Sequence, residues 1–176
     1  MTRRQEHGFT LVELLVAVAI IGIIAAIATP ELLRARIAGN EASAIASLRA
    51  IHSGQATYAS SCAHGGYAQS LEDLATPPTG SAAFVSPDIA ANGVVKSGYV
   101  VNVAPGTIPT VVAAAATVCN TPTGDALSTY FGEAHPVTVG STGQRSFGMD
   151  QRGTIFQELS GTTLTAVLPA SATPVQ

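Results

Sequence analysis

The sequence has little charge and few aromatic side chains. Charged residues make up 11% of the 176 residues, aromatic residues make up 5%, and the formal net charge is −3. The few lysines and arginines form no basic patch, so the composition gives no support for nucleic-acid binding. The aromatic residues form no cluster either, so no site for a ligand-binding module is evident.

The sequence also lacks the short motifs that mark common enzymes. It contains no serine in a nucleophile elbow, no phosphate-binding Walker loop and no paired-histidine metalloprotease motif. After the first eight residues, histidines occur only singly, at His52, His64 and His135. Three of the aspartates, Asp88, Asp125 and Asp150, also stand singly in predicted loops, without the spacing of a calcium-binding loop. We therefore expect a protein that is not an enzyme and uses no cofactor, with calcium binding left open.

What the sequence does contain is one long apolar segment close to its N-terminus. From Leu14 to Ala28, fifteen consecutive residues carry neither a charge nor a hydroxyl group. Counted from Phe9, the segment has twenty residues, which as an α-helix would rise about 30 Å, the thickness of the bilayer hydrocarbon. Only Thr10 and Glu13 interrupt it, so the segment predicts a membrane-spanning helix.

Glu13 is the one acidic residue in this segment. A charged group at the centre of a membrane helix costs on the order of 3 kcal/mol, and less near an end, where Glu13 lies. The carboxylate therefore needs a cationic partner. If the chain is cut between Gly8 and Phe9, the new ammonium group of Phe9 can supply it, from the same chain or from a neighbouring copy. A buried carboxylate that pairs with another subunit sets the register between copies.

The N-terminal residues resemble the type IV prepilin signature. The matching features are a basic leader with Arg3 and Arg4, then Gly8, then Phe9-Thr10-Leu11-Val12-Glu13, and then an apolar helix with Gly22 and Pro30. The resemblance implies that a membrane peptidase cuts after Gly8 and that the same enzyme methylates Phe9. It also implies that Glu13 aids methylation and assembly. The resemblance covers roughly the first 50 to 60 residues of the chain.

An ordinary secretory signal peptide is the alternative reading of this segment. Ala26-Ile27-Ala28 has the small-residue pattern of a signal-peptidase site. However, that reading does not explain Glu13, and the apolar run is longer than a typical signal-peptide core. We therefore interpret residues 1–8 as a leader. The arginines before the span place the leader in the cytoplasm and the rest of the chain on the other side of the membrane.

The chain after the leader divides into three predicted regions. Residues 9–29 form the transmembrane or filament-core helix, residues 30–60 an amphipathic continuation of it, and residues 61–176 a β-rich head. Gly22 and Pro30 weaken the helix, and a kink or local melting is expected between them.

Apolar residues from 33 to 58 recur with helical spacing, so the helix is expected to continue to about Ser60. Four polar residues, Arg34, Glu41, Arg49 and Gln55, are expected on its other faces. The charges of the arginines and the glutamate would pair between subunits or form a solvated face.

The head is expected to be an antiparallel sheet packed on the helix, which gives an α+β fold like that of the pilins. Ser70 and Asp73 resemble a capping box at the start of a short helix over residues 70–74. Strands are predicted over residues 98–103, 130–134, 145–150 and 154–157, with a hairpin turn over 150–153. Residues 76–93 are predicted as a surface loop, residues 111–118 are ambiguous, and the last twenty residues form a weak strand and a frayed tail.

Two cysteines, Cys62 and Cys119, fall in the exported region. In an oxidising compartment a pair of cysteines most simply forms a disulfide. The alternative is a metal site with Cys62 and His64, but two ligands in a glycine-rich loop make a poor site. We therefore predict a disulfide and no metal ligands.

These features together predict a structural subunit of a type IV pilus-like filament, a homo-oligomer built by helix packing. Its expected partners are the prepilin peptidase and methyltransferase and an inner-membrane assembly platform. It would be a single-pass inner-membrane protein before assembly, and part of an extracellular pilus or a periplasmic pseudopilus afterwards. Two alternatives stay open: a minor pilin or pseudopilin of a type II secretion or DNA-uptake system, and a membrane-anchored periplasmic binding module.

Overall fold

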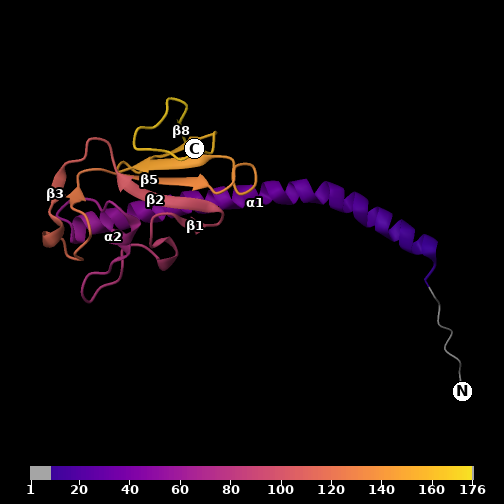
Figure 1. Ribbon diagram of the computed structural model, residues 1–176, viewed down its shortest axis with the longest axis horizontal. Coiled ribbons are helices and arrows are strands. Elements are labelled where there is room, and N and C mark those ends of the chain that lie inside the picture. Colours follow the sequence, from indigo (N-terminus) through magenta and orange to yellow (C-terminus); the bar gives the residue numbers. More distant parts are fainter. Residues whose placement is uncertain (1–8, 176) are drawn as a thin grey trace, which may run out of the picture. The chain divides into compact units, whose positions relative to one another are not determined.

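The computed structural model describes residues 9–175 (Figure 1). The leader predicted over residues 1–8, Gly8 included, lies outside the described part. The chain divides into two units, Met1–Arg36 and Ile37–Gln176, and one helix, α1 (Leu11–Ser61), contributes to both. This helix ends one residue beyond its predicted end at Ser60.

The first unit consists of the N-terminal part of α1. Every residue from Phe9 to Arg36 is exposed, including all the large apolar side chains of the predicted span. By length and composition, α1 is the one helix among the described residues that could cross a membrane. Exposure of so many apolar side chains to water is unfavourable, since each would gain about 1.5–3 kcal/mol from burial. This part of α1 therefore requires an apolar environment.

The backbone of α1 is helical through both Gly22 and Pro30. Next to the proline, the hydroxyl of Thr29 donates a hydrogen bond to the carbonyl oxygen of Ala25 at 2.7 Å. Proline removes one backbone hydrogen bond from a helix, and a threonine bonded to the preceding turn often bends a helix. The kink or melting between Gly22 and Pro30 stays a prediction.

The second unit contains a six-stranded antiparallel sheet with strand order β1-β2-β5-β6-β7-β8. Its strands are β1 (Val94–Lys96), β2 (Tyr99–Pro105), β5 (Tyr130–Pro136), β6 (Ser146–Asp150), β7 (Ile155–Glu158) and β8 (Thr173–Pro174). A separate two-stranded sheet pairs β3 (Val111–Ala113) with β4 (Ala126–Leu127). The four predicted strands are confirmed as β2, β5, β6 and β7. The α+β fold, a long N-terminal helix packed on an antiparallel sheet, is confirmed as well.

Three short helices complete the second unit: α2 (Leu71–Ala75) and two 3₁₀ turns, η1 (Pro87–Ile89) and η2 (Ala115–Thr117). The predicted cap of α2 is present, because the Ser70 side chain accepts a hydrogen bond from the Asp73 backbone N–H at 3.2 Å. The reciprocal half of a capping box is absent, because the Asp73 carboxylate accepts from the backbone N–H of Thr123 instead.

The core lies between one face of the sheet and the C-terminal part of α1. Leu48, Ile51 and Tyr58 of α1 are fully buried, as the helical spacing predicted. On the sheet, side chains of β2 alternate between buried and less buried, which is the pattern of a strand with one face on a core. Gly132 of β5 faces the helix, and a Cβ atom there would come within 3.4 Å of Leu48.

Two of the four polar residues expected on the other faces of α1 are buried instead. Glu41 is 6% exposed and Gln55 is fully buried, so the prediction was wrong for both. Gln55 exchanges two hydrogen bonds with the backbone of Ala68, at 2.8 and 2.9 Å. Their partners lie elsewhere in the sequence, so helical periodicity alone could not place them inside. Arg34 and Arg49 are exposed, as expected.

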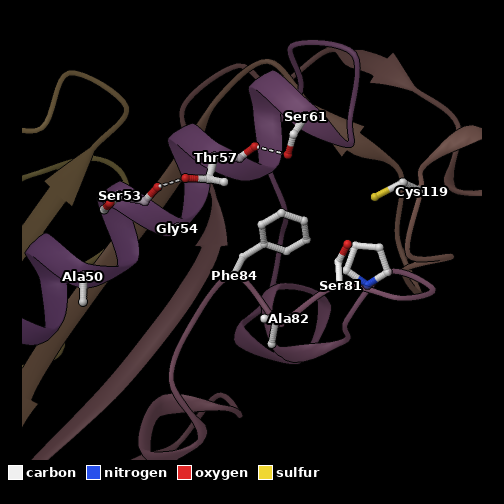
Figure 2. A pocket seen from close by; sticks show the side chains of 11 residues that line it. Ala50, Ser53, Gly54, Thr57, Ser61, Ser81, Ala82, Phe84 and Cys119 are labelled. Atoms are coloured by element: carbon white, nitrogen blue, oxygen red, sulfur yellow. Dashed lines mark hydrogen bonds between the residues drawn. The ribbon is translucent and has the colours of Figure 1, made fainter.

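The predicted surface loop over residues 76–93 is only partly a surface feature. Val85 and Ile89 are buried, and η1 forms inside the loop. Gly54 of α1 permits this packing, because a Cβ atom at that position would lie 2.6 Å from the carbonyl oxygen of Phe84. The lack of a side chain at Gly54 therefore lets the loop pack closely against the helix (Figure 2).

Candidate processing and assembly site

The start of α1 is organised by Thr10 and Glu13. The Thr10 hydroxyl oxygen accepts a hydrogen bond from the Glu13 backbone N–H at 3.3 Å. In return, the Glu13 carboxylate accepts from the Thr10 hydroxyl at 3.1 Å and from the Thr10 backbone N–H at 3.4 Å. This is a reciprocal capping box, which satisfies helix N–H groups that otherwise lack partners. This cap was not predicted, although its signal, a threonine followed three residues later by a glutamate, is present in the sequence.

Phe9 lies immediately before this cap. It is 76% exposed and is not part of the helix. Phe9, the residue that follows the predicted cleavage site, is therefore both accessible and non-helical. Cleavage there, and methylation of Phe9, stay predictions.

Glu13 is exposed and takes part in none of the ion pairs among residues 9–175. Its donors come only from Thr10, one turn away. A carboxylate near the N-terminus of a helix also gains from the helix dipole, by about 0.3–1 kcal/mol at exposed sites. The cap thus holds the carboxylate in place, and leaves it without a cationic partner within the described chain.

In the second unit, the predicted disulfide between Cys62 and Cys119 is present. It joins the residue after α1 to the segment after η2, across 57 residues of sequence. The next residue, Asn120, links the same segment to α2 and its C-terminal end. Its side-chain amide donates hydrogen bonds to the carbonyl oxygens of Asp73 and Thr76 at 2.7 and 2.9 Å. The disulfide excludes Cys62 as a metal ligand. The ring of His64 instead forms a hydrogen bond with the Thr117 carbonyl oxygen at 3.2 Å.

The other two histidines lie in separate places. The His52 ring on α1 is hydrogen-bonded to the Tyr130 hydroxyl at 2.8 Å, and burial raises the pKa of that hydroxyl. The His135 ring lies 3.1 Å from both carboxylate oxygens of Glu133, which is buried. The structure thus gives each histidine its own local partner and does not bring the three together.

One protein-family model matches the N-terminal segment. Residues 3–29 match the family model described as the prokaryotic N-terminal methylation motif. This segment therefore carries the N-terminal methylation motif. The predicted resemblance of the N-terminal segment to the prepilin signature is confirmed.

Two curated proteins are similar to the chain over part of its length. Over 54 residues it is 39% identical to the type IV major pilin protein PilA of Myxococcus xanthus (strain DK1622). This matched region covers 31% of this chain and 24% of that protein. Over 82 residues it is 35% identical to the type II secretion system core protein G of Pseudomonas aeruginosa. This matched region covers 46% of this chain and 58% of that protein. The chain therefore spans less than two thirds of the length of either relative. No solved structure matches the chain significantly.

Proposed function

We propose that this protein is the structural subunit of a type IV pilus-like filament. The observation that carries the proposal is the methylation motif, at residues 3–29, on a helix whose apolar side chains are all exposed from Phe9 to Arg36. A helix of this composition is stable in a bilayer or in the apolar core of an assembly. Its function is therefore assembly, and it needs no active site.

Processing is the first step of the proposed function. Prepilin peptidase cuts after Gly8, and the methyltransferase activity of the same enzyme modifies the new amino group of Phe9. The accessible, non-helical position of Phe9 and the cap that starts the helix at Leu11 support this order of events. Before assembly the chain is held in the inner membrane by residues 9–29.

Assembly is the second step. Subunits leave the bilayer at an inner-membrane assembly platform and pack their α1 helices together. The apolar side chains, which contact lipid before assembly, then contact the helices of other subunits. Glu13, which has no cation within the described chain, pairs with the Phe9 amino group of a neighbouring copy. A carboxylate inside an apolar assembly is tolerated only where such a partner is in place, which gives the subunits one register.

A pseudopilin of a type II secretion system is the second candidate. The observation that favours it is the similarity to core protein G over 82 residues, which extends beyond the 27 residues of the methylation motif. Both candidates share processing, membrane anchoring and helix packing. They differ in whether the filament leaves the cell.

The experiment that tests the proposal is purification of filaments from the source organism, followed by mass spectrometry of the subunit N-terminus. We expect filaments whose subunit begins with N-methylated Phe9. A mature chain that begins after Ala28 would contradict the proposal, because the apolar helix would then have been removed. Filaments sheared from the cell surface would favour the pilus, and filaments retained in the periplasm would favour the pseudopilus.

A further inference from the structure

Two arginines follow the predicted span on the same continuous helix. The span covers residues 9–29, and Arg34 and Arg36 lie five and seven residues beyond it, both exposed. At the rise of an α-helix, their Cα atoms lie about 8 and 11 Å beyond the end of the span. Side chains of an α-helix lean towards its N-terminus, so both guanidinium groups can reach back towards the membrane surface.

The two arginines differ in whether an acid of the same chain offsets their charge. The Nη1 atom of Arg34 donates to the Glu31 carboxylate at 3.0 Å, one turn earlier on α1. Arg36 takes part in none of the ion pairs among residues 9–175. The charge of Arg34 is therefore balanced locally, whereas the described chain supplies no carboxylate to Arg36.

The place of this cation is unusual for a membrane protein. The predicted orientation puts residues 1–8 in the cytoplasm and Arg36 on the exported side of the span. Arginines and lysines close to a span favour the cytoplasmic side, so a cation at the exported end opposes this orientation. Because Glu31 offsets only Arg34, the charge of Arg36 is stabilised at this level only by an anion from outside the chain.

Lipid headgroups supply anions at this level. Each headgroup region extends about 5–8 Å beyond the hydrocarbon, within reach of an arginine side chain that leans back towards the span. A guanidinium group matches the geometry of a phosphate group and binds it by two parallel hydrogen bonds. Leu32 and Leu33, which are 72% and 42% exposed, precede Arg36 by about one turn. This turn of α1 therefore offers apolar side chains to the edge of the hydrocarbon and a cation to the phosphate groups.

We propose that Arg36 binds the phosphate group of an anionic phospholipid in the outer leaflet of the inner membrane before assembly. The inference rests on the membrane anchoring in the proposed function, and it goes further by naming the ligand and the residue that holds it. An anionic lipid is favoured because its headgroup carries no cation that offsets the phosphate charge. The contact fixes the depth of α1 in the bilayer, since the guanidinium group is attracted to the headgroups and excluded from the hydrocarbon.

A photoreactive lipid tests this contact. The full chain is reconstituted into vesicles that contain phosphatidylglycerol with a photoreactive headgroup, and crosslinks are counted peptide by peptide, so that lipid bound to the leader arginines is scored separately. We expect crosslinks at residues 32–40, and Arg36→Gln should lower them about fivefold, the factor for roughly 1 kcal/mol per arginine near an anionic surface. Arg49→Gln is the matched control, because Arg49 is also exposed on α1 but lies about 20 Å further along the helix. Glu31→Gln should raise the crosslinks, because Arg34 then has no acid beside it.

Three outcomes would overturn the lipid contact. Equal crosslinking of Arg36→Gln and the unmodified chain would refute it, and so would equal crosslinking by phosphatidylcholine with the same photoreactive group. Unchanged lipid crosslinks with a lower filament yield in Arg36→Gln would assign Arg36 to an acid of a neighbouring copy instead. Carbonate extraction of the vesicles separates failure of the inference from failure of the proposed function. A chain that is extracted is not anchored, whereas a chain that stays in the membrane without these crosslinks refutes the lipid contact alone.

Discussion

Arg145 and Glu41 form an ion pair across 104 residues of sequence. The Nε atom of Arg145 donates to the Glu41 carboxylate at 3.0 Å, and the same carboxylate accepts from the backbone N–H groups of Gln144 and Arg145 at 3.1 and 3.3 Å. The Tyr99 hydroxyl donates to the Arg145 carbonyl oxygen at 2.8 Å, and burial, together with the nearby Glu41 carboxylate, raises the pKa of that hydroxyl. This network attaches the segment before β6 to α1.

Removal of one partner should therefore destabilise the second unit. We expect Arg145→Ala to lower the free energy of unfolding by about 2–3 kcal/mol, because it leaves the Glu41 carboxylate buried without its cation. Urea unfolding of the detergent-solubilised chain, followed by near-UV circular dichroism, measures this loss. Arg34→Ala is the control, since Arg34 pairs with Glu31 on an exposed surface and should have no measurable effect. Equal stabilities of the two variants would contradict the prediction.

The role of Glu13 can be separated from cleavage. We expect Glu13→Ala to leave cleavage largely intact but to impair methylation of Phe9 or assembly, because the neighbouring amino group loses its carboxylate. Mass spectrometry of the N-terminus reports cleavage and methylation, and the yield of sheared filaments reports assembly. Glu31→Ala, a change of another exposed acid on α1, should assemble normally. Normal filament yield from Glu13→Ala would count against the register role.

Gly8 should control processing itself. We expect Gly8→Leu to block cleavage, because a small residue suits the peptidase subsite before the cut. Immunoblotting would then show only the uncut form of the chain. Gly22→Ala is the comparison, because a Cβ atom at Gly22 meets no atom within 4 Å. Cut protein at normal levels in Gly8→Leu would show that the subsite tolerates a bulky residue.

The disulfide should provide a large share of the stability of the second unit. For a loop of 57 residues, the chain-entropy model predicts about 4 kcal/mol, less any strain. We expect the double variant Cys62→Ser with Cys119→Ser to lose stability of that order in urea unfolding. The unmodified chain, unfolded with and without a thiol reductant, should show the same difference. A loss of less than about 1 kcal/mol in the free energy of unfolding would mean that reduction adds little conformational entropy to the unfolded chain.

Stability should fall at alkaline pH because of Tyr58. Burial, with a smaller effect of the Asp73 carboxylate, raises the pKa of Tyr58 from 10.0 to about 12. The folded state thus favours the neutral hydroxyl, and the stability that this contributes is fully present below pH 10 and is lost as the pH rises towards 12. Unfolding free energies measured from pH 8 to pH 12 should show the decline.

Tyr58→Phe should reduce that decline without a loss of stability at neutral pH. Among the described residues, the buried Tyr58 hydroxyl has no hydrogen-bond partner, so its removal leaves no other group unpaired. The aromatic contact with Phe84 is kept by phenylalanine. A loss of more than about 1 kcal/mol at pH 7 would show that the hydroxyl makes a stabilising contact, through a bound water for example.

Local patterns were enough for several elements of the fold. Aromatic and β-branched residues predicted β2, β5, β6 and β7, and a serine cap predicted α2, because each of these signals acts over a few neighbouring residues. Two short strands, β1 and β4, escaped prediction. Strands of two or three residues depend on the partner that pairs with them, so their own sequence carries little signal.

The sequence by itself determined the N-terminal segment. The order of Gly8, Phe9 and Glu13 and the length of the apolar run are local properties, and they predict processing and anchoring without reference to any other part of the chain. Burial in the second unit was decided only by the tertiary structure. Glu41 and Gln55 lie inside because Arg145 and the Ala68 backbone satisfy their polar atoms, and a buried polar group is tolerated only where such partners meet it.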